Sequence, residues 1–279
     1  MPIHDQGYRR YGGGRAPRGH AWAVIASAGI RTMLAKRAFL GLLLISLLPF
    51  FARAVQIYLA SNLPQAAFLA PTPEMFRQFL EQQEIWVFFI TVYAGAGLIA
   101  NDRRANALQI YLSKPLTRTE YVFGKLAILM TFLLLITWVP ALVLLVVQIA
   151  FAGNFQFFSS NLYLFPAITL FSFIQVVTVA SAMLALSSLS NSSRYVGILY
   201  AALLFFSQAL FGVLRFVSGN TSLSWISVPF DLNQVGDAIF RLPPRYDTPW
   251  VLSLAALVAL VAIAALVLER RVRGVEVVA

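Results

Sequence analysis

Six apolar segments constrain the fold of this chain more than any other feature of its sequence. They cover residues 38–58, 84–100, 121–149, 164–189, 195–216 and 249–268. Each is near the roughly 20 residues that a helix needs to cross about 30 Å of hydrocarbon. Lipid offers the backbone no hydrogen-bond partner, and a helix satisfies its backbone within one segment. The sequence therefore predicts an all-α integral membrane protein with six transmembrane helices, the third of them kinked at Pro140.

The composition agrees with a chain that lies mostly in lipid and argues against an enzyme. Charged residues make up 11% of the sequence, against about 25% in soluble domains. Cysteine is absent, and the two histidines, His4 and His20, precede the first apolar segment. The sequence contains no GxxxxGK[ST] phosphate loop and no predicted mid-membrane carboxylate. We therefore expect no catalytic residue, no metal site and no cofactor bound by this chain.

The distribution of positive charge predicts the orientation. One side of the predicted bundle holds both termini, the connector between the second and third spans, and the 191–194 loop, with 16 Lys and Arg residues. The other side holds five. Because positively charged loops remain in the cytoplasm, both termini and the connector are expected there.

Segments outside the six spans have distinct compositions. Residues 1–19 are rich in Gly and Arg and predict a disordered basic tail that rests on anionic lipid, rather than an RNA-binding tail. Residues 20–37 are weakly amphipathic, which suits either an interfacial elbow helix or an extension of the first span. Residues 269–279 form a cytoplasmic C-terminal tail. On the other side of the membrane, we expect short helices over 74–83 and, amphipathic at the outer interface, over 230–242.

The connector, residues 101–125, contains several local signals. Asn101 or Asp102 can cap a short helix, which Pro115 cannot continue. The stretch from Thr117 to Glu120 matches a capping box, so the next helix is expected to start at Arg118. These signals predict a short coupling helix across the membrane surface, followed by a capped transmembrane helix. An ordinary basic loop is the alternative interpretation.

Neutral polar residues lie within the predicted spans. They either line a substrate pathway or form interhelical hydrogen bonds, which usually contribute less than about 2 kcal/mol. The possible pathway-lining residues are Thr137, Gln175, Thr178, Ser181 and Gln208.

The connector resembles that of ABC-2 type transporter permeases, the membrane subunits of a class of ATP-binding cassette (ABC) exporters. The pattern is an acidic residue just after the second span, a short amphipathic run ending in Leu-Leu-Ser, then Pro-x-x-Arg, an aromatic residue and Gly-Lys. The matching positions here are Asp102, Leu108, Leu112-Ser113, Pro115, Arg118, Tyr121 and Gly124-Lys125. The chain departs from the family at Asn106-Ala107-Leu108, where members often have Gly-Thr-Leu or Gly-Ser-Leu.

The resemblance implies a six-helix ABC-2 type transmembrane domain over 38–268 that couples ATP hydrolysis on a separate chain to export. The expected partners are an ABC ATPase subunit carrying ATP and Mg²⁺, a second permease copy or paralogue, and membrane lipid, but no nucleic acid. The expected location is a prokaryotic cytoplasmic membrane. The implied ATPase-coupling residues are Asp102, Arg103, Arg104, Leu108, Tyr111, Leu112, Ser113, Pro115, Arg118 and Glu120.

Other functions are compatible with the same residues. An ATP-driven complex that acts on a partner protein without carrying a solute, and a non-transporting membrane scaffold, both fit the connector. A secondary carrier would need an ionisable residue at the membrane centre, and a membrane enzyme would need a reactive cluster. The sequence does not identify a substrate.

Overall fold

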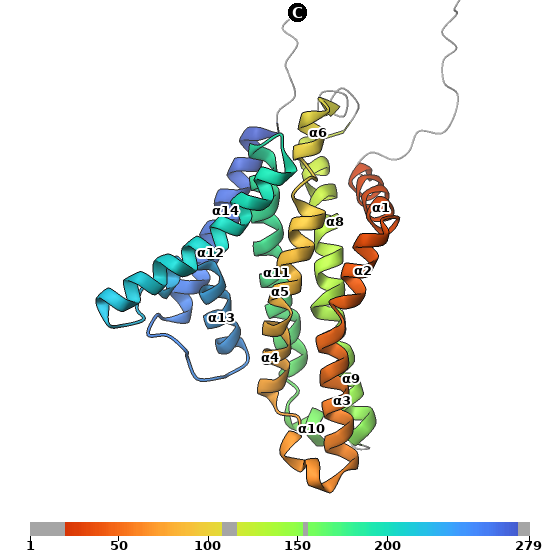
Figure 1. Cartoon of the computed structure of the whole chain (residues 1–279), viewed down its shortest axis with the longest axis vertical. Coiled ribbons are helices and arrows are strands. Elements are labelled where there is room, and N and C mark those ends of the chain that lie inside the picture. The colour runs from red at the N-terminus through yellow and green to blue at the C-terminus, as the bar shows by residue number, and fades with distance from the viewer. Residues whose placement is uncertain (1–19, 108–115, 153–155, 273–279) are drawn as a thin grey trace, which may run out of the picture.

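The computed structural model describes residues 20–107, 116–152 and 156–272, which fold into helices with no strand among them (Figure 1). Six helical stretches are long and apolar enough to cross a membrane, which confirms the predicted number of spans and a multi-pass membrane protein. They are Arg37–Asn62, Pro73–Arg104, Arg118–Phe151, Leu164–Leu189, Ser193–Ser218 and Trp250–Arg271.

The first span follows a separate helix, α1 (Ala21–Leu34), which lies within the predicted elbow segment. The span consists of α2 (Arg37–Ile45) and α3 (Leu48–Asn62). Pro49 sits in the first turn of α3, where a missing N–H costs nothing. The hydroxyl of Ser46 donates to the carbonyl of Leu43 at 2.7 Å and satisfies one backbone group at the break between the two helices.

The second span is longer than the sequence suggested. After a short 3₁₀ helix, η1 (Pro64–Leu69), it begins with α4 (Pro73–Gln82), where Thr72 accepts a hydrogen bond from the Met75 N–H. It continues through α5 (Glu84–Ile90), the π-helix η2 (Thr91–Gly95) and α6 (Ala100–Arg104). The helix expected over 74–83 as a separate outer element is thus stacked end to end on this span.

The third span divides into α8 (Arg118–Ile136) and α9 (Trp138–Ala152), followed by α10 (Gln156–Ser160). The division falls at Thr137, one turn before the expected kink at Pro140. Proline has no N–H to donate to the carbonyl of Ile136, four residues earlier, so the hydrogen-bond ladder fails there. The Ala141 N–H resumes it by bonding to the carbonyl of Thr137 at 3.2 Å.

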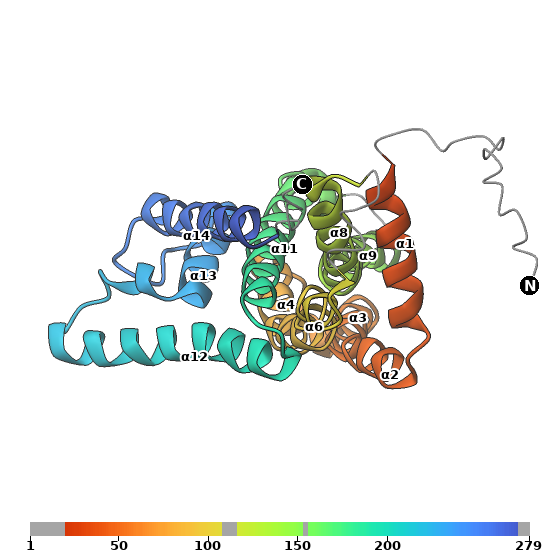
Figure 2. The ribbon, with the colours of Figure 1, turned by 90° about the horizontal axis from the view of Figure 1, so that it is seen from above.

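The remaining helices are α11 (Leu164–Leu189), α12 (Ser193–Ser218), the 3₁₀ turn η3 (Ser224–Ile226), α13 (Val228–Ile239) and α14 (Trp250–Arg271). Helix α11 is the most enclosed span, with 72% of its most apolar stretch buried, against 17–56% in the other five spans. Figure 2 shows why: α11 stands between the group of α12, α13 and α14 and the group that includes α1, α2, α3, α8 and α9.

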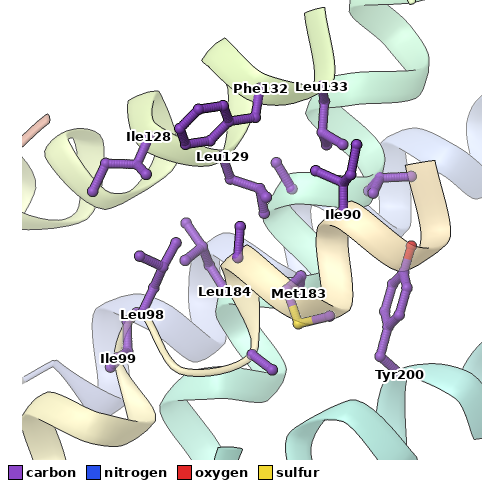
Figure 3. Packing of buried hydrophobic residues seen from close by; sticks show 14 of the residues in the cluster. Ile90, Leu98, Ile99, Ile128, Leu129, Phe132, Leu133, Met183, Leu184 and Tyr200 are labelled. Atoms are coloured by element: carbon purple, nitrogen blue, oxygen red, sulfur yellow. The ribbon is translucent and has the colours of Figure 1, made fainter. Parts of the chain in front are cut away.

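The largest hydrophobic core lies where α5, η2, α8, α11 and α12 meet (Figure 3). Its central side chains include Ile90, Leu129, Phe132, Met183 and Tyr200, each at most 1% exposed. We call the end of the bundle that carries α6 and the start of α8 the connector end; it is at the top of Figure 1. The end that carries η1 and α10 is the far end.

Candidate coupling site at the connector end

The second span is broken just before the connector. Residues 91–95 form a π-helix, and residues 96–99 form turns before α6 begins. Such π-bulges are rare and often occur at functional sites. Small residues surround the break, and a Cβ built on Gly95 would lie 2.5 Å from the Met183 side chain of α11. The absence of a side chain at Gly95 therefore lets the broken helix approach α11 closely.

One side chain from α11 satisfies the backbone at this break. The Ser187 hydroxyl accepts from the N–H groups of Ile99 at 3.1 Å and Ala100 at 3.0 Å, and it donates to the carbonyl of Ala96 at 2.9 Å. A hydroxyl has one donor and two acceptor positions, so this one is fully used. Ser187 is completely buried, where each of these backbone groups would otherwise lack a partner.

Helix α6 is bonded to both neighbouring spans. Asp102 Oδ2 accepts a hydrogen bond from the Tyr121 hydroxyl at 2.7 Å and lies 2.7 Å from the Lys125 ammonium, both on α8. The guanidinium of Arg103 donates to the carbonyl of Ser188 on α11. The Asp102 and Lys125 side chains are only 18% and 13% exposed, which strengthens their attraction relative to a fully solvated pair.

The start of α8 forms the predicted capping box. Thr117 Oγ1 accepts from the Glu120 N–H at 3.2 Å, and Glu120 Oε2 accepts from the Thr117 N–H at 3.0 Å. Asp102 does not cap, contrary to expectation, and neither does Asn101. Helix α6 begins at Ala100, so both residues lie inside the helix, and Asp102 bonds to α8 instead.

Helix α1 packs directly on the first turns of α8. A Cβ added at Gly124 would lie 2.8 Å from Ile25 Cβ and 3.0 Å from the Trp22 carbonyl oxygen. At Gly29, the nearest atom of Ile128 would be closer still. These two glycines allow the backbones of α1 and α8 to cross at close range, so α1 belongs to the same assembly as the connector end.

Half of the predicted coupling residues can be placed. Asp102 and Arg103 bond to α8 and α11, Glu120 is in the capping box, and Arg104 and Arg118 are exposed. The remaining five lie outside the described residues: Leu108, Tyr111, Leu112, Ser113 and Pro115.

The possible pathway residues occupy different surroundings. Thr137, Gln175 and Thr178 are at most 3% exposed, and the Thr137 hydroxyl bonds to the Leu133 carbonyl of its own helix. Ser181 lines a cavity of about 430 Å³ between α8 and the end of α14, and Gln208 is half-buried on α12. Their pathway role remains a prediction.

A second polar cluster, towards the far end, was not anticipated. The fully buried Arg77 of α4 lies 3.1 Å from Asp237 and 2.7 Å from the Asn233 side-chain oxygen, both on α13. Its guanidinium stacks over Phe171 of α11, 4.7 Å from the ring centroid. Arg245 adds a contact of 2.6 Å to Asp237 and two of 2.7 Å to Glu81. The sequence interpretation placed Arg77 and α13 at the outer surface, whereas both are packed against protein.

The polar face of α13 is also enclosed, because this helix is packed against the rest of the protein. Asp231, Asn233, Gln234 and Asp237 are at most 8% exposed, so this helix is not amphipathic towards the outer interface as expected. The pKa of Asp231 is raised to about 7 by burial, and the hydroxyl of Ser253 on α14 acts in the opposite direction. The pKa of Asp237 is also raised by burial, against the lowering effect of Arg77 and Arg245.

In comparisons with known proteins, no family model matches this chain, and no curated protein matches it significantly. The likeness to ABC-2 type permeases therefore rests on the connector residues and the six spans alone. No group of three or more His, Asp or Glu side chains suited to a metal ion occurs within residues 20–107, 116–152 and 156–272.

Proposed function

We propose that this chain is the membrane subunit of an ABC-2 type ATP-binding cassette transporter that exports its substrate. A separate ATPase subunit binds the connector, and ATP hydrolysis on that subunit displaces it. The connector end and both termini face the cytoplasm of a prokaryotic cell. A second permease copy or a paralogue completes the pathway.

The bonds of Asp102 to Tyr121 and Lys125 are the observation that carries this proposal. These three residues are the acidic, aromatic and lysine positions of the connector pattern, and they come from the two spans that the connector joins. A force on the connector is therefore delivered to α6 and α8 as one unit. An ordinary loop does not need its two ends joined in this way.

The break in the second span supports the same mechanism. Helix α6 is bonded to α8 and α11, whereas residues 91–99 immediately before it are not regular α-helix. Displacement of the connector would bend the second span there without unfolding it, because Ser187 already supplies the hydrogen bonds that regular helix would provide. The break is thus the hinge of the proposed cycle.

The test begins with purification of the tagged chain from its native membrane. We expect an ABC ATPase subunit to copurify, and its ATP hydrolysis to be stimulated by the permease. Leu112→Asp places a charge on the apolar face predicted for the coupling helix, so it should abolish this stimulation while membrane insertion is retained. Leu63→Asp makes the same change at an exposed leucine of the far end and should leave stimulation intact.

Two results would contradict the proposal. One is a native complex without a nucleotide-hydrolysing subunit. The other is normal stimulation by Leu112→Asp, which would show that this face does not couple the subunits. ATPase docking without movement of any solute would instead indicate a complex that acts on a partner protein.

A further inference from the structure

A groove of about 840 Å³ lies beside the hinge at the connector end. One wall is formed by α1 and by Lys36, which lies between α1 and α2. The opposite wall is the first turn of α12. The floor is formed by the broken second span and by α8. Its volume falls within the roughly 300–1,000 Å³ typical of small-molecule sites. The groove therefore has room for a ligand that touches α1 and α12 at once.

Most of the groove lining is apolar. Val24, Ile25 and Met33 contribute from α1, Val92 from η2 and Ile128 from α8. Ala28 of α1 also lines it and leaves space, because its side chain is small. Such a surface suits a hydrocarbon chain better than a hydrated solute.

The charged part of the lining is mainly positive. Lys36, Lys125 and Arg194 line the groove, with Asp102 as the acidic residue among its lining side chains. Asp102 is paired with Lys125. Within the described part of the chain, Lys36 and Arg194 form no ion pair; the Lys36 ammonium only lies 3.6 Å from the Met33 sulfur and 5.9 Å from the Tyr93 ring centroid. Two cations on opposite walls thus have no anionic partner among the residues that the structure describes.

We propose that the groove binds an anionic glycerophospholipid, with its phosphate between Lys36 and Arg194 and an acyl chain along the apolar floor. The combination of two cations that lack an ion pair with apolar side chains from α1, η2 and α8 matches the two halves of this ligand. The inference rests on the proposed orientation, because the cytoplasmic leaflet carries the negative surface potential. A lipid in this position bridges α1 and α12 across the hinge, and its occupancy regulates how far the second span bends.

The test uses the purified permease alone, so its result does not depend on any ATPase. Native mass spectrometry measures binding of dioleoyl phosphatidylglycerol and of dioleoyl phosphatidylcholine, which has the same chains but no net charge. We expect tighter binding of phosphatidylglycerol. The Lys36→Gln/Arg194→Gln variant should bind it roughly 30-fold more weakly, since each basic residue near an anionic lipid contributes about 1 kcal/mol and 1.4 kcal/mol is a factor of ten.

A matched control removes two charges from the same region. Arg31 and Arg37 are exposed on α1 and α2 but do not line the groove, so Arg31→Gln/Arg37→Gln should leave phosphatidylglycerol binding unchanged. Ala28→Trp fills the apolar part and should weaken binding without any change of charge. Glycerophosphoglycerol, the same headgroup without acyl chains, should not compete.

Each opposite result would overturn the inference. Equal binding of the two lipids, or equal losses in the two double variants, would mean that the basic surface attracts lipid without a defined site. Full binding by Ala28→Trp would place the chain elsewhere. Displacement by glycerophosphoglycerol would show a site for soluble phosphate compounds rather than for a lipid.

Discussion

Arg77 and Asp237 form a buried salt bridge of 3.1 Å across 160 residues of sequence, with side chains 0% and 2% exposed. This pair connects α4, at the far end of the second span, to α13, which precedes the sixth span. Because α6 lies at the other end of the same span, the bundle holds the second span at both ends by ionic contacts and leaves the break at residues 91–99 between them.

Removing the carboxylate of this pair should be strongly destabilising. Asp237→Leu leaves the buried Arg77 without a carboxylate partner, and breaking a buried pair from one side costs about 3–5 kcal/mol. Adding Arg77→Leu removes the stranded charge, so the double variant should recover most of the loss. Glu81→Gln, which breaks only the half-exposed contact with Arg245, should cost about 0–1 kcal/mol. Unfolding in detergent measures all three, and a double variant no more stable than Asp237→Leu would contradict the assignment.

The pH dependence of stability should reveal Asp231. Its pKa is about 7 when folded, against an ordinary value of 3.8, so the folded state holds a proton that the unfolded state has released between these values. Its contribution is therefore complete below about pH 4 and is lost as the pH rises through about 7. Each pKa unit corresponds to about 1.4 kcal/mol, so Asp231→Asn should remove a fall in stability on the order of a few kcal/mol.

Asp247 provides a control of opposite sign. Hydrogen bonds from the Thr221 hydroxyl and N–H lower the pKa of Asp247, so its contribution is present at neutral pH and is lost on acidification. Asp247→Asn should flatten the acid side of the profile and leave the fall in stability between about pH 4 and 7 unchanged. Melting temperatures across this range distinguish the two variants, and identical profiles for Asp231→Asn and wild type would contradict the first expectation.

The sequence predicts those features that depend only on residues close together in the chain. The six spans follow from hydropathy, and the Thr117–Glu120 capping box follows from a spacing of three residues. The same local grounds predict a capping role for Asp102, but α6 begins two residues earlier, and the Asp102 carboxylate bonds to Tyr121 and Lys125 of α8 instead. A capping prediction cannot include a partner whose position depends on how two helices pack.

The unpredicted features depend on which helix faces meet. The sequence around Arg77 does not identify Asp237 as its partner. Helix α4 follows a proline-containing loop, a pattern that predicts a surface helix and not a buried one. Ser187 is one of two adjacent serines near the end of an apolar helix, and only the rotation of α11 decides which of them faces the break. Two adjacent serines near the end of a span indicate a helix–helix contact, but they do not identify the broken second span as the partner.

Ser187→Ala should loosen the break in the second span. Without the hydroxyl, the N–H groups of Ile99 and Ala100 and the carbonyl of Ala96 lose their partner, and an unsatisfied buried group costs about 1–3 kcal/mol. Ser188→Ala is the matched control, because the Ser188 hydroxyl bonds to Ala185 within its own helix. Hydrogen exchange should accelerate at residues 99 and 100 in Ser187→Ala only. Equal acceleration in both variants would show that the Ser187 hydroxyl has no special role.

The Asp102–Lys125 pair can be tested by reversing its charges. If it transmits force from the connector to α8, Asp102→Asn should lower ATPase stimulation and reduce stability by about 1.5–3 kcal/mol, the usual contribution of a hydrogen bond to a charged group. Asp102→Lys/Lys125→Asp restores the attraction with the residues exchanged and should recover part of both losses. Arg215→Gln, at the exposed end of α12, removes one charge away from the pair and should change neither. Recovery of stability without recovery of stimulation would separate the two roles. The pair would then hold α6 on α8 without transmitting the displacement of the ATPase subunit.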